Sequence, residues 1–137
     1  MMNLTALLAD AAGGSHFVEL ALSIDSVTPG ACPPRFGLST FAAPAPVRII
    51  SVPAEVQVLG FHTVPERHLT IALDGDVEYE TTDGERRRFG PGQPVLVADL
   101  TGRGHVTRFA PGEQRFLHIP TPDAWPAPNT PDHPHVA

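Results

Sequence analysis

The sequence predicts an all-β protein, built as an antiparallel sandwich or barrel. Short apolar and β-branched runs recur along the chain, and glycine, proline or Asp-Gly pairs separate one run from the next. The chain of 137 residues also contains 16 prolines and 12 glycines, which favour tight turns between short strands over long helices. Its length corresponds to a single domain.

The expected strands follow the alternation of apolar residues between turn signals. A first strand begins at Phe17 within residues 15–24, and a short strand at 37–40 lies in a proline-rich loop that covers 27–46. Further strands are expected at residues 47–52, 56–61, 67–73, 76–81, 85–89, 95–100, 105–109 and 114–119.

Two terminal segments lie outside this series. Leu4, Leu7 and Leu8 would share one face of a helix that ends at Gly13-Gly14, so residues 1–14 are expected to form a short helix or a loosely packed arm. The β domain covers residues 15–119. Residues 120–137 are expected to form a proline-rich extended tail, in which Trp125 is the large apolar residue available for docking.

The composition argues against several classes of function. A net charge of −6 disfavours a nucleic-acid partner, because phosphate binding requires a basic surface. Cys32 is the single cysteine, so no disulfide forms within the chain and a reducing, cytoplasmic location is expected. We expect no membrane partner, since neither a signal peptide nor a membrane-length apolar run is present. The lack of a glycine-rich phosphate loop predicts no nucleotide cofactor.

Three histidines indicate a pocket. His62 and His68 flank Pro65, and His105 follows the Gly102-Arg-Gly104 turn. Residues six apart in a straight strand lie about 20 Å from each other, so His62 and His68 converge only if the chain bends between them. Pro65 favours such a bend.

Alternation along each strand predicts the neighbours of these histidines. Val58, Gly60 and His62 are expected on one face of their strand, with Leu59 and Phe61 on the other. The candidates for the substrate pocket share a face with a histidine or lie at the expected mouth; they are Thr70, Thr107, Phe109, Glu66 and Arg67.

Other polar residues have structural interpretations. His118 follows Phe116 on the same face of a late strand and is expected to be a core or rim residue. The arginines at 86–88 lie near Glu78 and Glu80 in the expected hairpin, which predicts cross-strand ion pairs on a solvated face.

The spacing of the histidines resembles the cupin superfamily. One cupin signature is a histidine pair followed at set distances by a glutamate and a glycine. With Gly75 at the glycine position, His62 matches the first histidine, Val64 replaces the second, and His68 replaces the glutamate.

A later cupin signature, a glycine followed after two residues by a histidine, is met by Gly102 and His105. Residues 84–92 resemble the hairpin that separates the two signatures in small bacterial cupins. The start at 15–17 and the run at 99–105 are similar to one subgroup of single-domain cupins. The resemblance covers residues 15–119.

The resemblance implies a cupin-type antiparallel β-barrel, or jelly roll, that forms a homodimer and takes a small-molecule substrate. His62, His68 and His105 would hold one divalent transition metal, for which iron, nickel, zinc and copper all suit imidazole ligands. The leading hypothesis is therefore a metal-assisted enzyme that performs isomerisation, cyclisation, lyase or oxygenase chemistry. Two alternatives remain open: a metal-free epimerase or cyclase in which His105 or His68 is the general base, and a small-molecule-binding module without catalysis.

Overall fold

The protein is all-β, as the sequence predicts. The computed structural model describes residues 2–22, 25–27, 36–38 and 41–126, and in these residues every regular element is a strand. The strands are β1 (Met2–Ala9), β2 (Ser15–Leu22), β3 (Asp25–Val27), β4 (Phe36–Leu38), β5 (Arg48–Val52), β6 (Val58–His62), β7 (His68–Ala72), β8 (Val77–Glu80), β9 (Arg86–Phe89), β10 (Pro94–Ala98), β11 (His105–Phe109) and β12 (Gln114–Pro120). Cys32 and the end of the predicted 37–40 strand lie outside the described residues.

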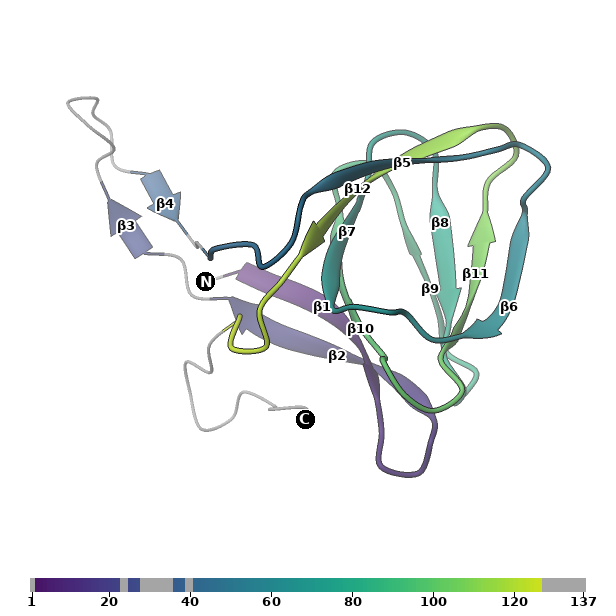
Figure 1. The fold of residues 1–137 in the computed structure, drawn as a ribbon, viewed down its shortest axis with the longest axis horizontal. Coiled ribbons are helices and arrows are strands. Elements are labelled where there is room, and N and C mark those ends of the chain that lie inside the picture. The colour runs from purple at the N-terminus through teal and green to yellow at the C-terminus, as the bar shows by residue number, and fades with distance from the viewer. Residues whose placement is uncertain (1, 23–24, 28–35, 39–40, 127–137) are drawn as a thin grey trace.

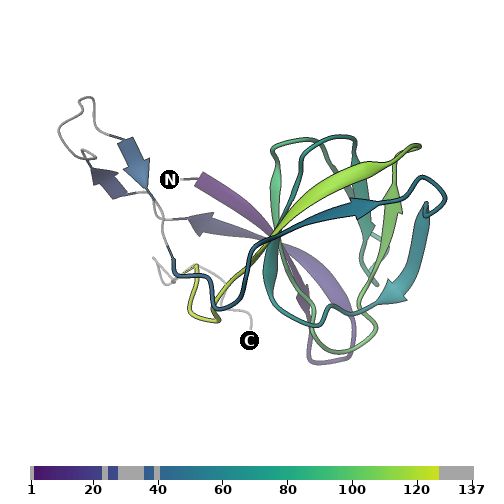
Figure 2. The ribbon, with the colours of Figure 1, turned by 45° about the horizontal axis from the view of Figure 1, so that its top comes forward.

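Two facing sheets make up the domain (Figures 1 and 2). The larger sheet has six strands in the order β2-β1-β10-β7-β12-β5, and the smaller has four in the order β6-β11-β8-β9. β3 and β4 form a separate pair. From β6 to β12 the chain passes repeatedly from one sheet to the other, so residues at the ends of consecutive strands come together across the space between the sheets.

Two details of the predicted architecture are wrong. The sheets are not closed into a barrel, because β5 and β6 are the edge strands of different sheets and no described pairing joins them. The strands are also not all antiparallel, since β1 runs parallel to β10. The N-terminal strand is added to the larger sheet beside a strand that lies far away in the sequence.

Residues 2–9 form a strand, so the predicted N-terminal helix is wrong. β1 pairs along its length with β2 and also with β10, which covers both of its edges. Leu4 and Leu8 pack into one buried cluster and Leu7 packs into another, so both faces of β1 are covered. This is not a loosely packed arm either, because Leu4 is 2% exposed and Leu7 is fully buried.

Two buried hydrophobic clusters pack against the two faces of the larger sheet. The cluster between the sheets contains Leu7, Phe17, Ala72, Val77, Tyr79, Phe89, Val95, Val97 and Phe116. The cluster on the opposite face of the larger sheet contains Leu4, Ala6, Leu8, Leu20, Leu69 and Leu96. Trp125 packs against this second cluster, and its ring lies 4.5 Å from that of Phe41. The first residues after β12 therefore cover the outer face of the larger sheet.

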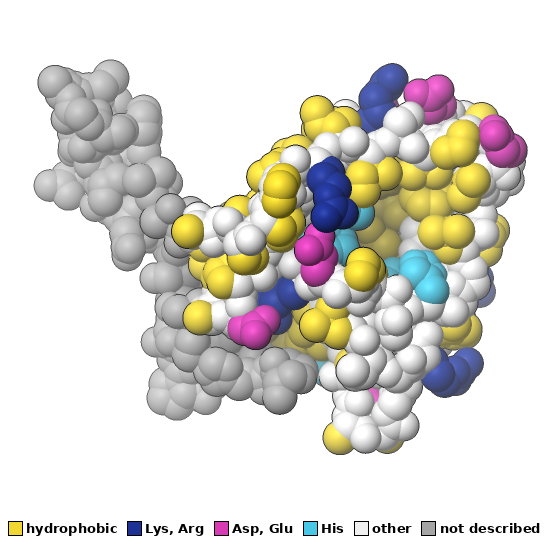
Figure 3. Space-filling model, viewed as in Figure 1, with side chains coloured by type: hydrophobic (Ala, Val, Ile, Leu, Met, Phe, Trp, Pro, Cys, Tyr) yellow, Lys and Arg dark blue, Asp and Glu magenta, His cyan; other side chains and the backbone are white. Residues whose placement is uncertain are grey.

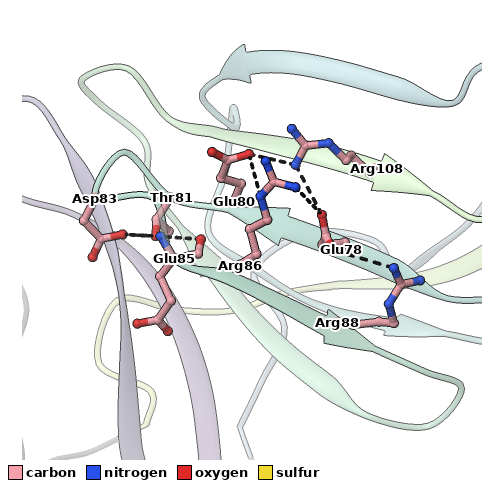
Figure 4. Close-up of polar contacts among 8 residues, drawn as sticks. All are labelled: Glu78, Glu80, Thr81, Asp83, Glu85, Arg86, Arg88 and Arg108. Carbon is pink, nitrogen blue, oxygen red and sulfur yellow. Dashed lines mark hydrogen bonds and ion pairs between the residues drawn. The ribbon is translucent and has the colours of Figure 1, made fainter.

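The predicted cross-strand ion pairs are present on the smaller sheet (Figure 4). Glu78 and Glu80 on β8 lie between the arginines of β9 and Arg108 of β11. Arg86 Nε lies 3.3 Å from Glu80, and Arg108 Nη1 lies 2.8 Å from the same carboxylate. These arginines are exposed or half-exposed, so each ion pair contributes little to the stability of the fold. Since carboxylates already neutralise the arginines, this face is a solvated network and not an anion site.

Candidate functional site

A pocket of about 360 Å³ opens between the two sheets. Figure 3 shows it as a hollow with hydrophobic walls, with histidine side chains inside and charged side chains at its edge. Its volume suits a small organic molecule. The lining comes from both sheets and from the connection between β6 and β7; it comprises Arg48, Ile50, Val52, Leu59, His62, Thr63, Val64, Pro65, Glu66, His68, Thr70, Tyr79, Val97, His105, Thr107, Phe109, Phe116 and His118.

The change of sheet after β6 brings the predicted histidines into this pocket. β6 ends at His62 in the smaller sheet, and β7 begins at His68 in the larger sheet. The chain bends through Pro65 between them, as the sequence predicts. His105 begins β11 directly opposite His62, and their rings lie 4.7 Å apart. All three histidines line the pocket.

An irregularity in β6 changes one predicted face. The register of β6 on β11 shifts between His105 and Thr107, so that Leu59 pairs with Thr107 while His62 pairs with His105. Leu59 and His62, three residues apart, therefore both line the pocket. The prediction that Leu59 faces away from His62 is wrong, because strict alternation does not hold across a bulge.

Asp99 positions His105. The imidazole Nδ1 of His105 lies 2.5 Å from Asp99 Oδ2. Both side chains are buried, at 2% and 0% exposure, and the second oxygen of Asp99 has no hydrogen-bond partner in the described residues. An Nδ1–H that donates to a carboxylate leaves Nε2 as the nitrogen with a free lone pair. The carboxylate also stabilises the imidazolium that forms when Nε2 takes a proton.

Glycine at position 104 allows this arrangement. Gly104 has a φ of +74°, and a Cβ there would lie 1.7 Å from the carbonyl oxygen of His62. The backbone of the turn before β11 therefore touches the backbone at the end of β6, which explains how His62 and His105 come together. The Ser15 hydroxyl donates to the Gly104 carbonyl oxygen at 2.6 Å and ties the same turn to β2.

The other two predicted histidines are also hydrogen-bonded through Nδ1. His62 Nδ1 lies 2.7 Å from the Gly60 carbonyl oxygen, and His68 Nδ1 lies 2.9 Å from that of Glu66. A carbonyl oxygen only accepts, so in each ring Nδ1 carries the hydrogen and Nε2 is an acceptor. Burial lowers the pKa of His68, an effect that its hydrogen bond to Glu66 partly opposes.

Tyr79 supplies a protonated phenol beside His105. Its ring meets the His105 ring edge-on, with centroids 5.2 Å apart. Complete burial raises the pKa of Tyr79 far above its ordinary value, against the opposing effect of a hydrogen bond with Thr70. The phenol therefore stays neutral at physiological pH, with its hydroxyl hydrogen-bonded to Thr70 of the facing sheet.

His118 is a pocket residue that the sequence interpretation missed. Its ring stacks on His68 with centroids 4.4 Å apart. Burial is the largest cause that lowers the pKa of His118 to about 4, and the charges of the nearby His68 and Arg48 act in the same direction. The available signal was alternation, because Phe116 and His118 pair with Ala72 and Thr70 and so continue the inward face of β7.

The pKa of His118 predicts acid destabilisation. The folded pKa is about 4 and lies below the ordinary value of 6.5, so folding favours the neutral ring. This contribution is complete above pH 6.5 and is lost as the pH falls towards 4. We expect a loss of about 1–2 kcal/mol, discounted from the full shift because the ring is partly exposed. Urea unfolding at neutral pH and at pH 4.5 measures it, and His118→Gln should reduce the difference; an equal difference in both proteins would contradict the assignment.

The other predicted pocket residues are placed as follows. Glu66, Thr70, Thr107 and Phe109 all line the pocket. Arg67 does not, and its prediction as a pocket residue is wrong. Its Nη2 donates to the Trp125 carbonyl oxygen at 2.6 Å, on the opposite side of the chain from Glu66 and His68. Arg67 instead fixes the segment that follows β12.

The three histidines that would hold the metal implied by the cupin resemblance offer suitable donor atoms, but they do not lie in suitable positions. The three Nε2 acceptors, each held by a hydrogen bond at Nδ1, match the way metal-binding histidines are usually oriented. However, the described residues contain no group of three His, Cys, Asp or Glu side chains close enough to hold an ion. His62 pairs with His105 while His68 pairs with His118. The residues as placed do not fit a three-histidine metal centre, and we derive no chemical step through one.

Comparison with known proteins adds little to this description. No family model matches the chain, and no curated protein matches it. Among solved structures, the chain is similar to a candidate ethanolamine utilization protein Q (EutQ) from Salmonella typhimurium LT2. The sequence identity is 14%, the alignment covers 89% of this chain and 97% of that one, and the TM-score is 0.38. A TM-score this low supports no inference about this chain.

The fold and the pocket together define an all-β domain of two facing sheets with a ligand-sized, histidine-lined pocket between them. In the described part of the chain there is no helix with the length and hydrophobicity needed to cross a membrane.

Proposed function

We propose that this protein binds a small, largely apolar organic molecule between its sheets and catalyses a proton transfer on it, with His105 as the general base. The observation that carries the proposal is the buried contact between Asp99 and His105 at the pocket wall. Proton transfer by a positioned histidine typically accelerates a reaction by about 10²- to 10⁴-fold. Isomerisation, epimerisation and cyclisation through a carbanion or enolate all begin with such a step.

In the proposed reaction, His105 both removes the proton from the substrate and returns it. Neutral His105 takes a proton from an acidic C–H of the substrate at Nε2, which leaves an enolate and an imidazolium. Asp99 stabilises the imidazolium, and the neutral Tyr79 ring packs edge-on against the His105 ring. The imidazolium then returns the proton to the same carbon or to another, and His105 is neutral again. His68 is the second candidate base, because the Glu66 carbonyl oxygen engages its Nδ1, which leaves Nε2 as the nitrogen with a lone pair.

Hydrogen exchange tests this without knowledge of the product. Proton abstraction in deuterated water replaces substrate C–H by C–D, which proton NMR follows directly. We expect the protein to accelerate exchange next to the carbonyl of benzylacetone or phenylpyruvate above the buffer rate. His105→Gln should abolish the acceleration, while Arg86→Gln on the distant ion-pair network should keep it. Equal exchange with and without His105 would overturn the proposed base.

A second candidate, favoured by the contact that engages Nδ1 in each of the three histidines, is a metal ion bound by His62, His68 and His105 after these side chains rearrange from their present positions. Metal analysis of untagged protein beside a His62→Ala/His105→Ala double variant tests it. We expect near-stoichiometric iron, nickel, zinc or copper in the unchanged protein and a loss in the variant if this site forms. The tail histidines at 133 and 135 are retained in both proteins and so act as an internal control. Equal metal content in both would rule this centre out.

The remaining alternative is a binding module without catalysis. It predicts that a bound probe exchanges no faster than it does in buffer.

A cytoplasmic homodimer also remains part of the proposal, and the edge strands β5 and β6 offer a surface for a second copy. Ile49 is 69% exposed and Val58 is 58% exposed on these strands. Light scattering that gives the monomer mass of 14.6 kDa would contradict the dimer.

A further inference from the structure

The charged residues at the pocket mouth bear on the chemical class of the ligand. Arg48 is the single lysine or arginine among the lining residues in the described part of the chain, and Glu66 is the single carboxylate. Arg48 Nη2 lies 3.2 Å from Glu66 Oε1. The remaining lining is apolar, hydroxyl or imidazole, so this ion pair carries the formal charges of the pocket.

The ion pair is weak enough to open for a ligand. The Arg48 side chain is 55% exposed and that of Glu66 is 36% exposed, and solvated pairs of this kind contribute little to stability. In the described part of the chain, Arg48 and Glu66 have no ion-pair partner other than each other. A ligand carboxylate that replaces Glu66 would gain a planar guanidinium able to hold both of its oxygens.

Arg48 is also directed towards the interior of the pocket. It starts β5 directly opposite His118 in the pairing of β5 with β12. The electrostatic effect of its guanidinium reaches the His118 ring, where it acts in the same direction as burial and the neighbouring His68. The arginine therefore borders the His118 end of the pocket, with part of its side chain in solvent.

We infer that the ligand is a small apolar carboxylate, whose carboxylate replaces Glu66 on Arg48 while its apolar body fills the space between the sheets. This inference rests on the proposed function and names the substrate class of the same site. The protein as a whole has a net charge of −6 and repels anions, so recognition of a carboxylate depends on this local arginine. Glu66 pairs with Arg48 and would compete with the ligand carboxylate for it.

Binding measurements on the full chain with two matched probes test the inference. Phenylacetate and phenylacetamide have the same apolar body and differ in charge. At neutral pH and low salt we expect phenylacetate to bind at least about tenfold more tightly, as lost charge-assisted hydrogen bonds predict. Arg48→Gln should remove this preference, and Glu66→Gln should strengthen phenylacetate binding by removing the competitor. Arg86→Gln is the control, because the Arg86 side chain is 56% exposed and also ion-paired, but lies outside the pocket.

The outcomes separate this inference from the proposed function. Equal binding of the two probes, or a preference that survives Arg48→Gln, overturns the carboxylate inference. Loss of the preference in Arg86→Gln as well would show a general charge effect and overturn it too. In deuterated water, slower protein-dependent exchange of phenylpyruvate in Arg48→Gln, with exchange of uncharged benzylacetone unchanged, supports it. Exchange of both probes unchanged in Arg48→Gln leaves His105 as the base and removes Arg48 as the anchor. Arg48-dependent phenylacetate binding without any exchange supports the anchor and removes the catalysis.

Discussion

Asp99→Asn is expected to lower protein-dependent hydrogen exchange at the substrate by about 10²- to 10⁴-fold with little change in binding. Asparagine has nearly the same volume as aspartate, so the buried position next to His105 remains filled. However, its amide is neutral and is able to donate to Nδ1, which turns the imidazole to the tautomer with a hydrogen on Nε2. A base that already carries this hydrogen takes no proton, and the imidazolium loses its counter-charge.

Two measurements distinguish this effect from a general loss of structure. Nitrogen NMR of the histidine rings should show the hydrogen of His105 on Nδ1 in the unchanged protein and on Nε2 in Asp99→Asn. Asp83→Asn is the matched control, since Asp83 accepts from the Thr81 hydroxyl at 2.6 Å in a turn outside the pocket. Full exchange activity in Asp99→Asn, with the protein folded, would remove Asp99 from the mechanism.

Gly104→Ala is expected to destabilise the protein by at least about 3 kcal/mol. Two costs add at this position. The φ of +74° is a left-handed conformation that alanine adopts with difficulty, and the new Cβ would overlap the carbonyl oxygen of His62. Because the overlapping atom belongs to the backbone, no change of rotamer relieves it. The end of β6 must move away from β11, which also separates His62 from His105.

Gly92→Ala is the matched control for this prediction. Gly92 has a φ of +81°, but a Cβ there would meet nothing within 4 Å. It should therefore show the conformational cost alone, on the order of 1–2 kcal/mol. Thermal unfolding should place the midpoint of Gly104→Ala about 10 °C or more below that of the unchanged protein, and clearly below Gly92→Ala. Equal midpoints for the two variants would mean that the close backbone approach between residues 62 and 104 is absent.

Strand positions were predictable where one face of a strand differs chemically from the other. In β7, Leu69 packs into the cluster on the outer face of the larger sheet, while His68 and Thr70 line the pocket, as alternation predicts. The two faces of β1 do not differ chemically in this way, because both are buried. A continuous apolar run of this kind fits a helix as well as a strand, and only pairing with β2 and β10 decides between them.

The histidines of the site were predictable, but their partners were not. Their residue type and nearby glycine turns singled out His62, His68 and His105, and the pocket contains all three. Asp99 lies six residues before His105, on the far side of a turn, and nothing in local periodicity indicates that its carboxylate reaches back to the ring. The Leu59 face was mispredicted for a related reason, since the alternation of residues in β6 does not show where its pairing with β11 becomes irregular.

The sequence by itself determined the all-β class, most strand positions, the bend between His62 and His68, and the histidine content of the pocket. These follow from local physical chemistry: alternation sets which side chains share a face, and glycine and proline set where the chain turns. Only the tertiary structure decided that the sheets stay open, that residues 2–9 join β10, and that Asp99 holds His105 while Arg48 and Glu66 lie at the mouth. Such contacts join residues from separate strands, and their free energy depends on how whole sheets pair and pack, which no short stretch of sequence contains.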